Sequence, residues 1–368
     1  MTPGAAYDPQ AALACATALQ RPEGVLGWSS AQWSLQLRLA RRTRLLGRLA
    51  HALHAQGLVD RLPALPRRHL LSELRASHWR TTALRWGLDR VGRVLADAAY
   101  PRVLLKGAAY QGQGLPIAGG RLPSDIDILV PRAALGDALG RLGAAGWTEP
   151  DLDEHDRRYY HEWSHEVPPL RHPSVRMELD LHHNIQPPLS RHPVDAGLLL
   201  ARLQPSLWPG WQVLHPLDQI LHCASHLFHD GDLHDRLRDL VDLDGMLRCF
   251  VVPQADWPAL LDRARQLGLA ESLALGLLLC ARWLATPVPP PVLDQACAAG
   301  LPAWRRACLL PLLRAVLLPG DPDQGDAWTR RVAGQLLLAR YQWQRLPLRL
   351  LLPHLWRKLG QRSADGPA

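Results

Sequence analysis

Lysine is nearly absent from this basic chain, and cysteine is sparse and scattered. Of the 42 lysines and arginines in 368 residues, only Lys106 and Lys358 are lysine. The six cysteines form no C-x-x-C pair, so the sequence gives no basis for a disulfide framework or a cysteine-ligated metal. We therefore expect reduced core cysteines in a cytoplasmic protein, at Cys15, Cys223, Cys249, Cys280, Cys297 and Cys308.

Long apolar runs are missing as well. No stretch of eighteen uncharged apolar residues occurs, so the sequence predicts no transmembrane segment, and no basic start with an apolar stretch marks a signal peptide. The chain is instead 47% hydrophobic and 21% charged, which is typical of a globular protein. Its net charge of +8 permits binding to nucleotides, nucleic acid or an anionic membrane, but the basic residues are spread along the whole chain.

Two common catalytic motifs are not found. The glycine-rich stretch GQGLPIAGG, residues 112–120, contains no G-x-G-x-x-G before a long helix, which excludes a Rossmann dinucleotide site. No G-x-S-x-G is present to support a serine hydrolase. The glycines in the stretch are left with two interpretations, close backbone approach to a triphosphate or a flexible surface loop.

Residues 103–130 carry the strongest chemical pattern. They read VLLKGAAYQGQGLPIAGGRLPSDIDILV, in which a Lys-Gly pair and the glycine-rich stretch precede two aspartates that alternate with isoleucine. Side chains alternate between the two faces of a strand, so Asp125 and Asp127 share one face. Neighbouring carboxylates repel each other unless a cation lies between them, and oxygen ligands suit Mg²⁺. The pattern predicts a magnesium site that binds a phosphate-bearing ligand.

A second strand, at residues 175–182, offers a third carboxylate. Glu178, Asp180 and His182 fall on one face of it. If this strand pairs with the first, three carboxylates meet, as in a two-metal phosphoryl-transfer site with ions about 3.5–4 Å apart. Glu178 has the alternative of an ion pair with Arg176 or Arg121.

These segments together resemble a known family, the uncharacterised nucleotidyltransferases of the polymerase-β-like superfamily. The resemblance spans residues 103–268 and is carried by Leu105-Lys106-Gly107, Arg121, residues 125–130, the LDLH of residues 179–182, and residues 222–247 followed by Trp257. The wider superfamily places Gly-Ser or Gly-Gly where this chain has Lys106-Gly107. This departure affects the expected binding of the nucleotide phosphates.

The resemblance implies an α+β fold, in which a polymerase-β-like nucleotidyltransferase domain with a small mixed sheet precedes a large α-helical C-terminal domain. It implies two Mg²⁺ ions and an NTP substrate, with Asp125, Asp127 and Asp180 as catalytic and metal-binding residues. Asp180 is preferred to Glu178 because it lies two residues before the histidine of the family pattern. The implied nucleotide-binding residues are Lys106, Gly107, Arg121, Ser124, His182, His226 and Arg238.

Three histidines on a predicted helix have more than one interpretation. His222, His226 and His229 share one helix face, and with Asp239 or Asp242 they form a candidate zinc set. The same spacing serves a hydrogen-bonded core or the lining of a cleft. We favour these two interpretations, because zinc sites seldom lie on a helix without cysteine.

Hydrophobic periodicity predicts helices around the sheet. They are a short helix within residues 1–27 and helices at 30–56, 70–98, 133–145, 216–228, 233–250, 257–267, 271–285, 291–299, 302–317 and 327–359. Residues 102–105 form a further predicted strand, and residues 151–165 are interpreted as a strand edge and loop. The predicted domains are residues 1–98, helices packing on the catalytic domain; 99–187, the catalytic core; and 188–368, an α-helical domain.

The predicted reaction transfers a nucleoside monophosphate to an unidentified hydroxyl-bearing acceptor and releases pyrophosphate. Lys106 and Arg121 are expected to balance the triphosphate charge, and His226, Arg238 and Asp242 to face the carboxylates. The alternatives are a catalytically silent nucleotide-binding or partner-binding module and an RNA-directed nucleotidyltransferase. The acceptor, whether a small molecule, peptide, protein or nucleic acid, is left open, as are the NTP and the oligomeric state. Residues 340–362 are basic and amphipathic, which fits either a docked terminal helix or a membrane surface.

Overall fold

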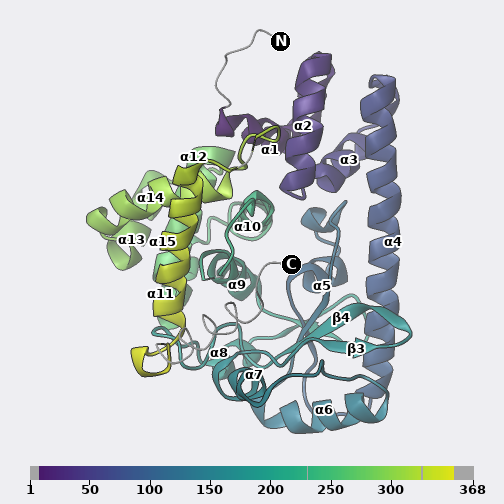
Figure 1. Cartoon of the computed structure of the whole chain (residues 1–368), viewed down its shortest axis with the longest axis vertical. Helices are drawn as coiled ribbons and strands as arrows, with labels where there is room; N and C mark the ends of the chain where they lie inside the picture. The colour runs from purple at the N-terminus through teal and green to yellow at the C-terminus, as the bar shows by residue number, and fades with distance from the viewer. Residues whose placement is uncertain (1–7, 230, 325, 352–368) are drawn as a thin grey trace, which may run out of the picture.

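A single mixed sheet lies among many helices in the computed structural model, which describes residues 8–229, 231–324 and 326–351 (Figure 1). Six strands are ordered β3-β4-β2-β1-β6-β5 in this part of the chain. Their bounds are β1 Val103–Leu104, β2 Ile126–Leu129, β3 Leu170–His172, β4 Val175–His182, β5 Gln204–Pro205 and β6 Gln212–Val213. The prediction of a small mixed sheet is confirmed, since β2 runs parallel to β4 and antiparallel to β1.

The helices surround this sheet and extend beyond it. They are α1 Leu13–Gln20, α2 Ser30–Arg42, α3 Leu46–Ala55, α4 Ala64–Val94, α5 Lys106–Gly112, α6 Leu135–Ala144, α7 Glu154–Arg158, α8 Ala196–Leu200, α9 Pro216–Phe228, α10 Leu237–Phe250, α11 Trp257–Gln266, α12 Ala270–Leu284, α13 Pro290–Gly300, α14 Ala303–Leu317 and α15 Trp328–Arg345. No helix of the described residues is long and apolar enough to cross a membrane.

The two predicted carboxylate strands are neighbours. In the β2–β4 pair, Asp127 lies opposite Asp180 and Ile126 opposite Leu179. The long helix α4 packs on the isoleucine face, so closely that a Cβ added at Gly87 would lie 2.4 Å from Ile126 Cδ1. Because strand faces alternate, the aspartates point to the other side of the sheet, as the sequence pattern predicted.

Three sequence-based predictions about elements are wrong. Residues 30–56 form two helices, because Arg44 adopts a left-handed conformation with φ 56° and ends the first of them. Residues 151–165 are mainly helical, with α7 followed by a π-helical turn at Tyr159–Trp163. The chain after residue 187 is not all helix, since β6 pairs with β1 and β5 with β6. No glycine or proline marks the break at Arg44, and two-residue strands are too short for periodicity to reveal.

Among the remaining helices, α9 matches its prediction at both ends, whereas α4 begins six residues before the predicted residue 70. A fourth prediction, that of one last helix at residues 327–359, is wrong as well, because α15 ends at Arg345, before Pro347. Residues 352–359 of that prediction, and the end of the basic, amphipathic segment at residues 340–362, lie outside the described residues. One buried apolar cluster runs from the N-terminal helices through the sheet to α15, so the proposed division into three domains remains a prediction.

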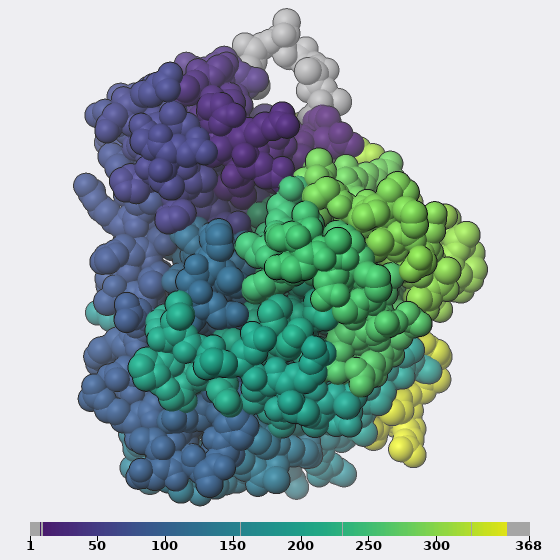
Figure 2. Space-filling model, turned by 180° about the vertical axis from the view of Figure 1, so that it is seen from behind, coloured from purple at the N-terminus to yellow at the C-terminus, as the bar shows by residue number. Residues whose placement is uncertain are grey.

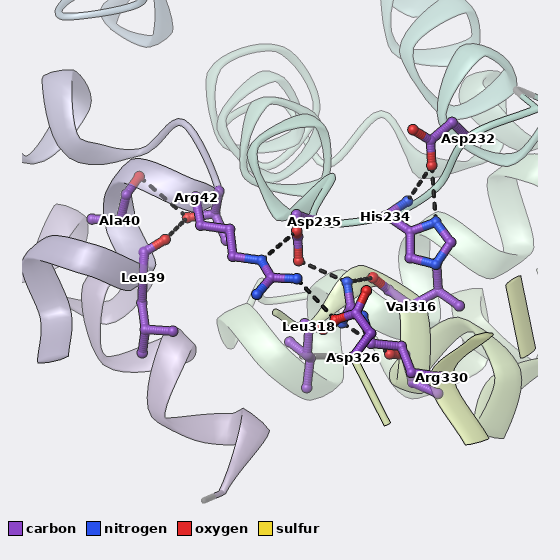
Figure 3. A network of polar contacts seen from close by, with 12 residues as sticks. Leu39, Ala40, Arg42, Asp232, His234, Asp235, Val316, Leu318, Asp326 and Arg330 are labelled. Carbon is purple, nitrogen blue, oxygen red and sulfur yellow. Dashed lines mark hydrogen bonds and ion pairs between the residues drawn. The ribbon is translucent and has the colours of Figure 1, made fainter. Parts of the chain in front are cut away.

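A network of ion pairs joins the N-terminal helices to the C-terminal ones (Figure 3). Asp235 accepts from Arg42 at the end of α2, 2.6 Å from its Nε, and from Arg330 of α15, 2.7 Å from its Nη2. Arg42 also reaches Asp326, at 2.9 Å from its Nη2. Seen from behind, the N-terminal helices lie along one side of the molecule and the later helices along the other (Figure 2).

The end of the glycine-rich stretch packs against α3. A Cβ added at Gly47 in α3 would lie 2.3 Å from the carbonyl oxygen of Gly120, whose own φ is 72°. This end of the stretch is therefore neither a flexible surface loop nor a backbone segment that approaches a phosphate. The contact instead fixes the backbone just before Arg121.

We expect Gly47→Ala to lower the free energy of unfolding by about 1–3 kcal/mol, because the added methyl group forces two backbones apart. The matched control is Gly140→Ala in α6, where an added Cβ meets nothing within 4 Å. That control should raise the stability by about 0.5–1 kcal/mol through its higher helix propensity. Chemical denaturation measures both, and equal responses would contradict the packing of α3 on Gly120.

Candidate active site

Asp127 is the centre of the polar groups on the aspartate face of the sheet. Its side chain is only 4% exposed. The same oxygen, Oδ1, lies 2.8 Å from Lys106 Nζ and 3.1 Å from His182 Nε2. Burial by itself would raise the pKa of Asp127, but Lys106 and His182 outweigh it and hold the pKa below the ordinary value. Asp127 is therefore a buried, ionised carboxylate with two donors.

Lys106 reaches this position from the first residue of α5, directly after β1. No other lysine lies in the described part of the chain. Burial alone would lower the pKa of Lys106. The nearby Asp127 and Glu166 carboxylates together raise the pKa by more than burial lowers it, so the net shift is upward. The ammonium is thus the positive charge that balances Asp127.

Asp180 is the second carboxylate beside Asp127. Burial and the negative charge of Asp127 raise the pKa of Asp180 to about 7. Glu178 lies on the same face of β4, but its Oε1 accepts from Arg171 Nε at 2.6 Å and its side chain is 44% exposed. The structure therefore brings Asp180, and not Glu178, to Asp127. The expected ion pair of Glu178 with Arg176 or Arg121 is wrong in its partner, which is Arg171 on the neighbouring strand β3.

The donor atoms of Asp127, Asp180 and His182 all lie within 4.8 Å of one another, close enough to hold a metal ion. The carboxylate oxygens of this group suit Mg²⁺. Asp125 is not part of this group, but it lines a cavity next to it together with Ser124. Burial and Asp127 raise the pKa of Asp125, which indicates that further negative charge here needs a cation.

Two cavities meet at the carboxylates and share Lys106 and His226. The larger has a volume of about 490 Å³ and the smaller about 130 Å³. The larger is lined by Lys106, Asp156, Tyr159, Tyr160, His165, Glu166, Asp180, Ile185, Gln186, Pro187, His226, His229, Tyr341 and Arg345. The smaller is lined by Asp125, Asp127 and Ser124 and by the basic residues Arg44, Arg121, Arg236 and Arg238, among others.

Arg121 lines the smaller cavity and is held in position by Asp242 and Tyr110. Its Nε donates to Asp242 at 3.0 Å, and Asp242 also accepts from Arg48 at 2.7 Å. The guanidinium lies over the Tyr110 ring, 5.3 Å from its centroid. A Cβ at Gly107 would lie 2.5 Å from Arg121 Nη1, so glycine is needed there for the arginine to lie against α5. Asp242, expected to face the carboxylates, is a buried partner of two arginines.

Arg238 also lines the smaller cavity. It pairs with its neighbour Asp239 at 2.9 Å, and Arg236 pairs with the same carboxylate at 3.1 Å. Two guanidinium groups thus pair with one carboxylate in the lining of the smaller cavity.

The histidines of the predicted helix line the two cavities. His226 lines both cavities and His222 the smaller one. His229 faces Ser272, with 3.3 Å between its Nδ1 and Oγ. Within the described residues, no three-residue metal group includes any of these histidines.

Two residues that the sequence analysis missed lie beside His182. Glu166 Oε2 is 3.3 Å from His182 Nδ1, and His165 lies next to it. Burial lowers the pKa of His165 to about 4, so the ring is neutral. His182, which was expected to bind the nucleotide, is 1% exposed and lines neither cavity. Its ring nitrogens lie against Asp127 and Glu166 instead. The sequence contains no motif that marks these two residues, because only an isolated bridge places Glu166 beside β4.

Fold and site define a mixed α/β protein with an acidic, metal-capable cluster between two polar cavities. The chain belongs to the uncharacterised nucleotidyltransferase family, whose sequence model matches residues 29–285. This match confirms the resemblance seen in the motifs and extends it to α2, α3 and α4 on one side and α12 on the other. No curated protein and no solved structure matches the chain.

The raised pKa of Asp180 predicts a pH-dependent loss of stability. The ordinary value is 3.8 and the folded value about 7, so the bound proton stabilises the fold fully below pH 3.8. This contribution is lost as the pH rises through 7. Relative to Asp180→Asn, the wild-type protein should lose on the order of 1–3 kcal/mol over this range in metal-free buffer.

Thermal denaturation of both proteins between pH 4 and 8 measures the difference. Added Mg²⁺ should remove it, because a bound cation favours the ionised carboxylate. A difference that stays constant with pH would show that Asp180 has an ordinary environment.

Proposed function

We propose that this protein transfers a nucleoside monophosphate from an NTP to a hydroxyl-bearing acceptor, with release of pyrophosphate. The observation that carries the proposal is the register of β2 and β4, which places Asp127 opposite Asp180. Membership of a nucleotidyltransferase family supports the same chemistry.

Asp125, Asp127 and Asp180 are the residues proposed to hold Mg²⁺. The fit rests on the clustered carboxylate oxygens of Asp127 and Asp180 and on the raised pKa values of Asp125 and Asp180, both of which a cation would reverse. When bound, Mg²⁺ polarises the reacting phosphate and stabilises the attacking and leaving oxygens.

Asp180 is the proposed general base. Its carboxylate lies opposite Asp127 and lines the larger cavity, so it can take a proton from an acceptor hydroxyl bound there. The hydroxyl oxygen then forms a bond to the α-phosphorus, the bond from that phosphorus to the bridging oxygen breaks, and pyrophosphate leaves with the electron pair. Lys106 and Arg121 balance the charge that develops on the leaving group.

The two cavities suggest where the substrate lies. The larger, at about 490 Å³, is within the usual range for a small-molecule site and is lined by three tyrosines, which offer stacking surfaces for a nucleobase. The smaller cavity is rich in arginine, which favours the pyrophosphate end of the nucleotide. Lys106, which lines both, is placed to contact the phosphates between them.

The test compares substitutions of carboxylates that share the aspartate face of the sheet but have different partners. Asp127→Asn and Asp180→Asn should each lower Mg²⁺-dependent pyrophosphate release by about 100-fold or more, since charge stabilisation of the transition state is lost. Glu178→Gln is the matched control, because Glu178 shares the face but pairs with Arg171. It should retain the wild-type rate.

The assay supplies the four NTPs, Mg²⁺ and a cell extract as the source of acceptor, and measures pyrophosphate. Turnover in Asp127→Asn equal to wild type would contradict the proposal. Calorimetry with NTP and Mg²⁺ separates the silent alternative, which predicts binding of the nucleotide with no product from any extract.

A further inference from the structure

A second group of metal-capable side chains lies on the other side of His182 from Asp127. It consists of His165, Glu166 and His182, whose donor atoms all lie within 4.8 Å of one another. His165 and Glu166 line the larger cavity, and His182 is buried beneath them. The carboxylate chemistry proposed above makes no use of His165 or Glu166.

The backbone holds these ligands on a rigid support. The amide of His183 donates to the carbonyl of His165 at 2.9 Å, and the amide of Val167 donates to Leu181 at 3.0 Å. The segment with His165 and Glu166 is therefore bonded along the end of β4. Ligands fixed to a strand in this way need little reordering to bind an ion.

The hydrogen bonding of His182 leaves one ring nitrogen without a donor or an acceptor partner. Its Nε2 lies 3.1 Å from Asp127 Oδ1, and a carboxylate only accepts, so the proton is on Nε2. The lone pair on Nδ1 then faces Glu166 Oε2 across 3.3 Å. Nδ1 is buried and makes no hydrogen bond. Two acceptors at this distance repel each other unless a cation lies close to both.

His165 adds a second nitrogen of the same kind. Its Nδ1 is also buried without a hydrogen-bond partner. The other ring nitrogen, Nε2, lies 3.9 Å from Glu166 Oε2. Buried polar atoms are rarely left without a partner, so the unpartnered Nδ1 of His182 beside Glu166, with His165 next to them, indicates a missing ligand.

We propose that His165, Glu166 and His182 bind one metal ion of the Zn²⁺ class, separate from the Mg²⁺ held by the aspartates. Two imidazoles and one carboxylate are a recognised set of protein ligands for zinc, and they leave a coordination position open. Asp127 acts here as the carboxylate that accepts from the far nitrogen of a metal-bound histidine and fixes its tautomer. Imidazole favours zinc over magnesium, which prefers oxygen.

The open position belongs to the larger cavity, which His165 and Glu166 line. A ligand in that cavity with an oxygen donor, such as a hydroxyl or carboxylate group, is the class of molecule the ion would bind. The site does not depend on nucleotidyl transfer, because its ligands and its test involve no NTP.

The test uses Co²⁺, which replaces Zn²⁺ and absorbs visible light when bound by imidazole. The purified full chain is freed of metal with a chelator and titrated with Co²⁺ in the presence of excess Mg²⁺, which fills sites made only of oxygen. Wild-type protein should bind one Co²⁺ per chain. His165→Ala and Glu166→Gln should each weaken the affinity by about 100-fold or more, because loss of a ligand costs at least as much as loss of a group that supports one.

His161→Ala is the matched control, since His161 lies four residues earlier with a half-exposed ring near Glu149. It should bind Co²⁺ as the wild type does, and thermal denaturation confirms that each variant is folded. Equal Co²⁺ affinity in wild type and in folded His165→Ala and Glu166→Gln would overturn the proposal. Folded wild-type protein that binds no Co²⁺ would overturn it as well, and would leave the pyrophosphate assay unaffected.

Discussion

Repulsion between two neighbouring carboxylates is the constraint on which this site depends. Asp127 and Asp180 lie opposite each other on adjacent parallel strands, and the charge is met by one ammonium group, that of Lys106. The pKa values of the two carboxylates therefore shift in opposite directions. Asp127 stays ionised, while the pKa of Asp180 rises to about 7. A pair balanced in this way gains from a divalent cation, which would favour the ionised form of Asp180.

The surrounding helices keep that pair in place. On one face of the sheet α4 approaches Ile126 so closely that Gly87 has no room for a side chain. On the other, Asp242 of α10 anchors Arg48 of α3 and Arg121 beside α5. The buried ion pairs contribute position more than stability, because their desolvation cost offsets much of their attraction. Arg48 and Asp242 both lie within the family match, which begins in the N-terminal helices, well before the aspartate-bearing strands.

Much of this site could be predicted from the sequence, because its strands obey a simple period. Alternation put Asp125 and Asp127 on one face, and the spacing before His182 selected Asp180. His165 and Glu166 could not be found, since they come from a segment with no periodicity that pairs with β4 only at an isolated bridge. The helix break at Arg44 and the short strands β5 and β6 were missed because tertiary packing, and not local propensity, sets them.

If the carboxylate pair directs attack at the α-phosphorus of an NTP, the fate of each phosphate is fixed. Incubation with NTP labelled either at the α- or at the γ-phosphate, with Mg²⁺ and a cell extract, follows both. We expect the α-label to move to a new product and the γ-label to be recovered in pyrophosphate, both with wild-type protein and neither with Asp127→Asn. Transfer of the γ-label to an acceptor would instead show phosphoryl transfer and would rule out nucleotidyl transfer.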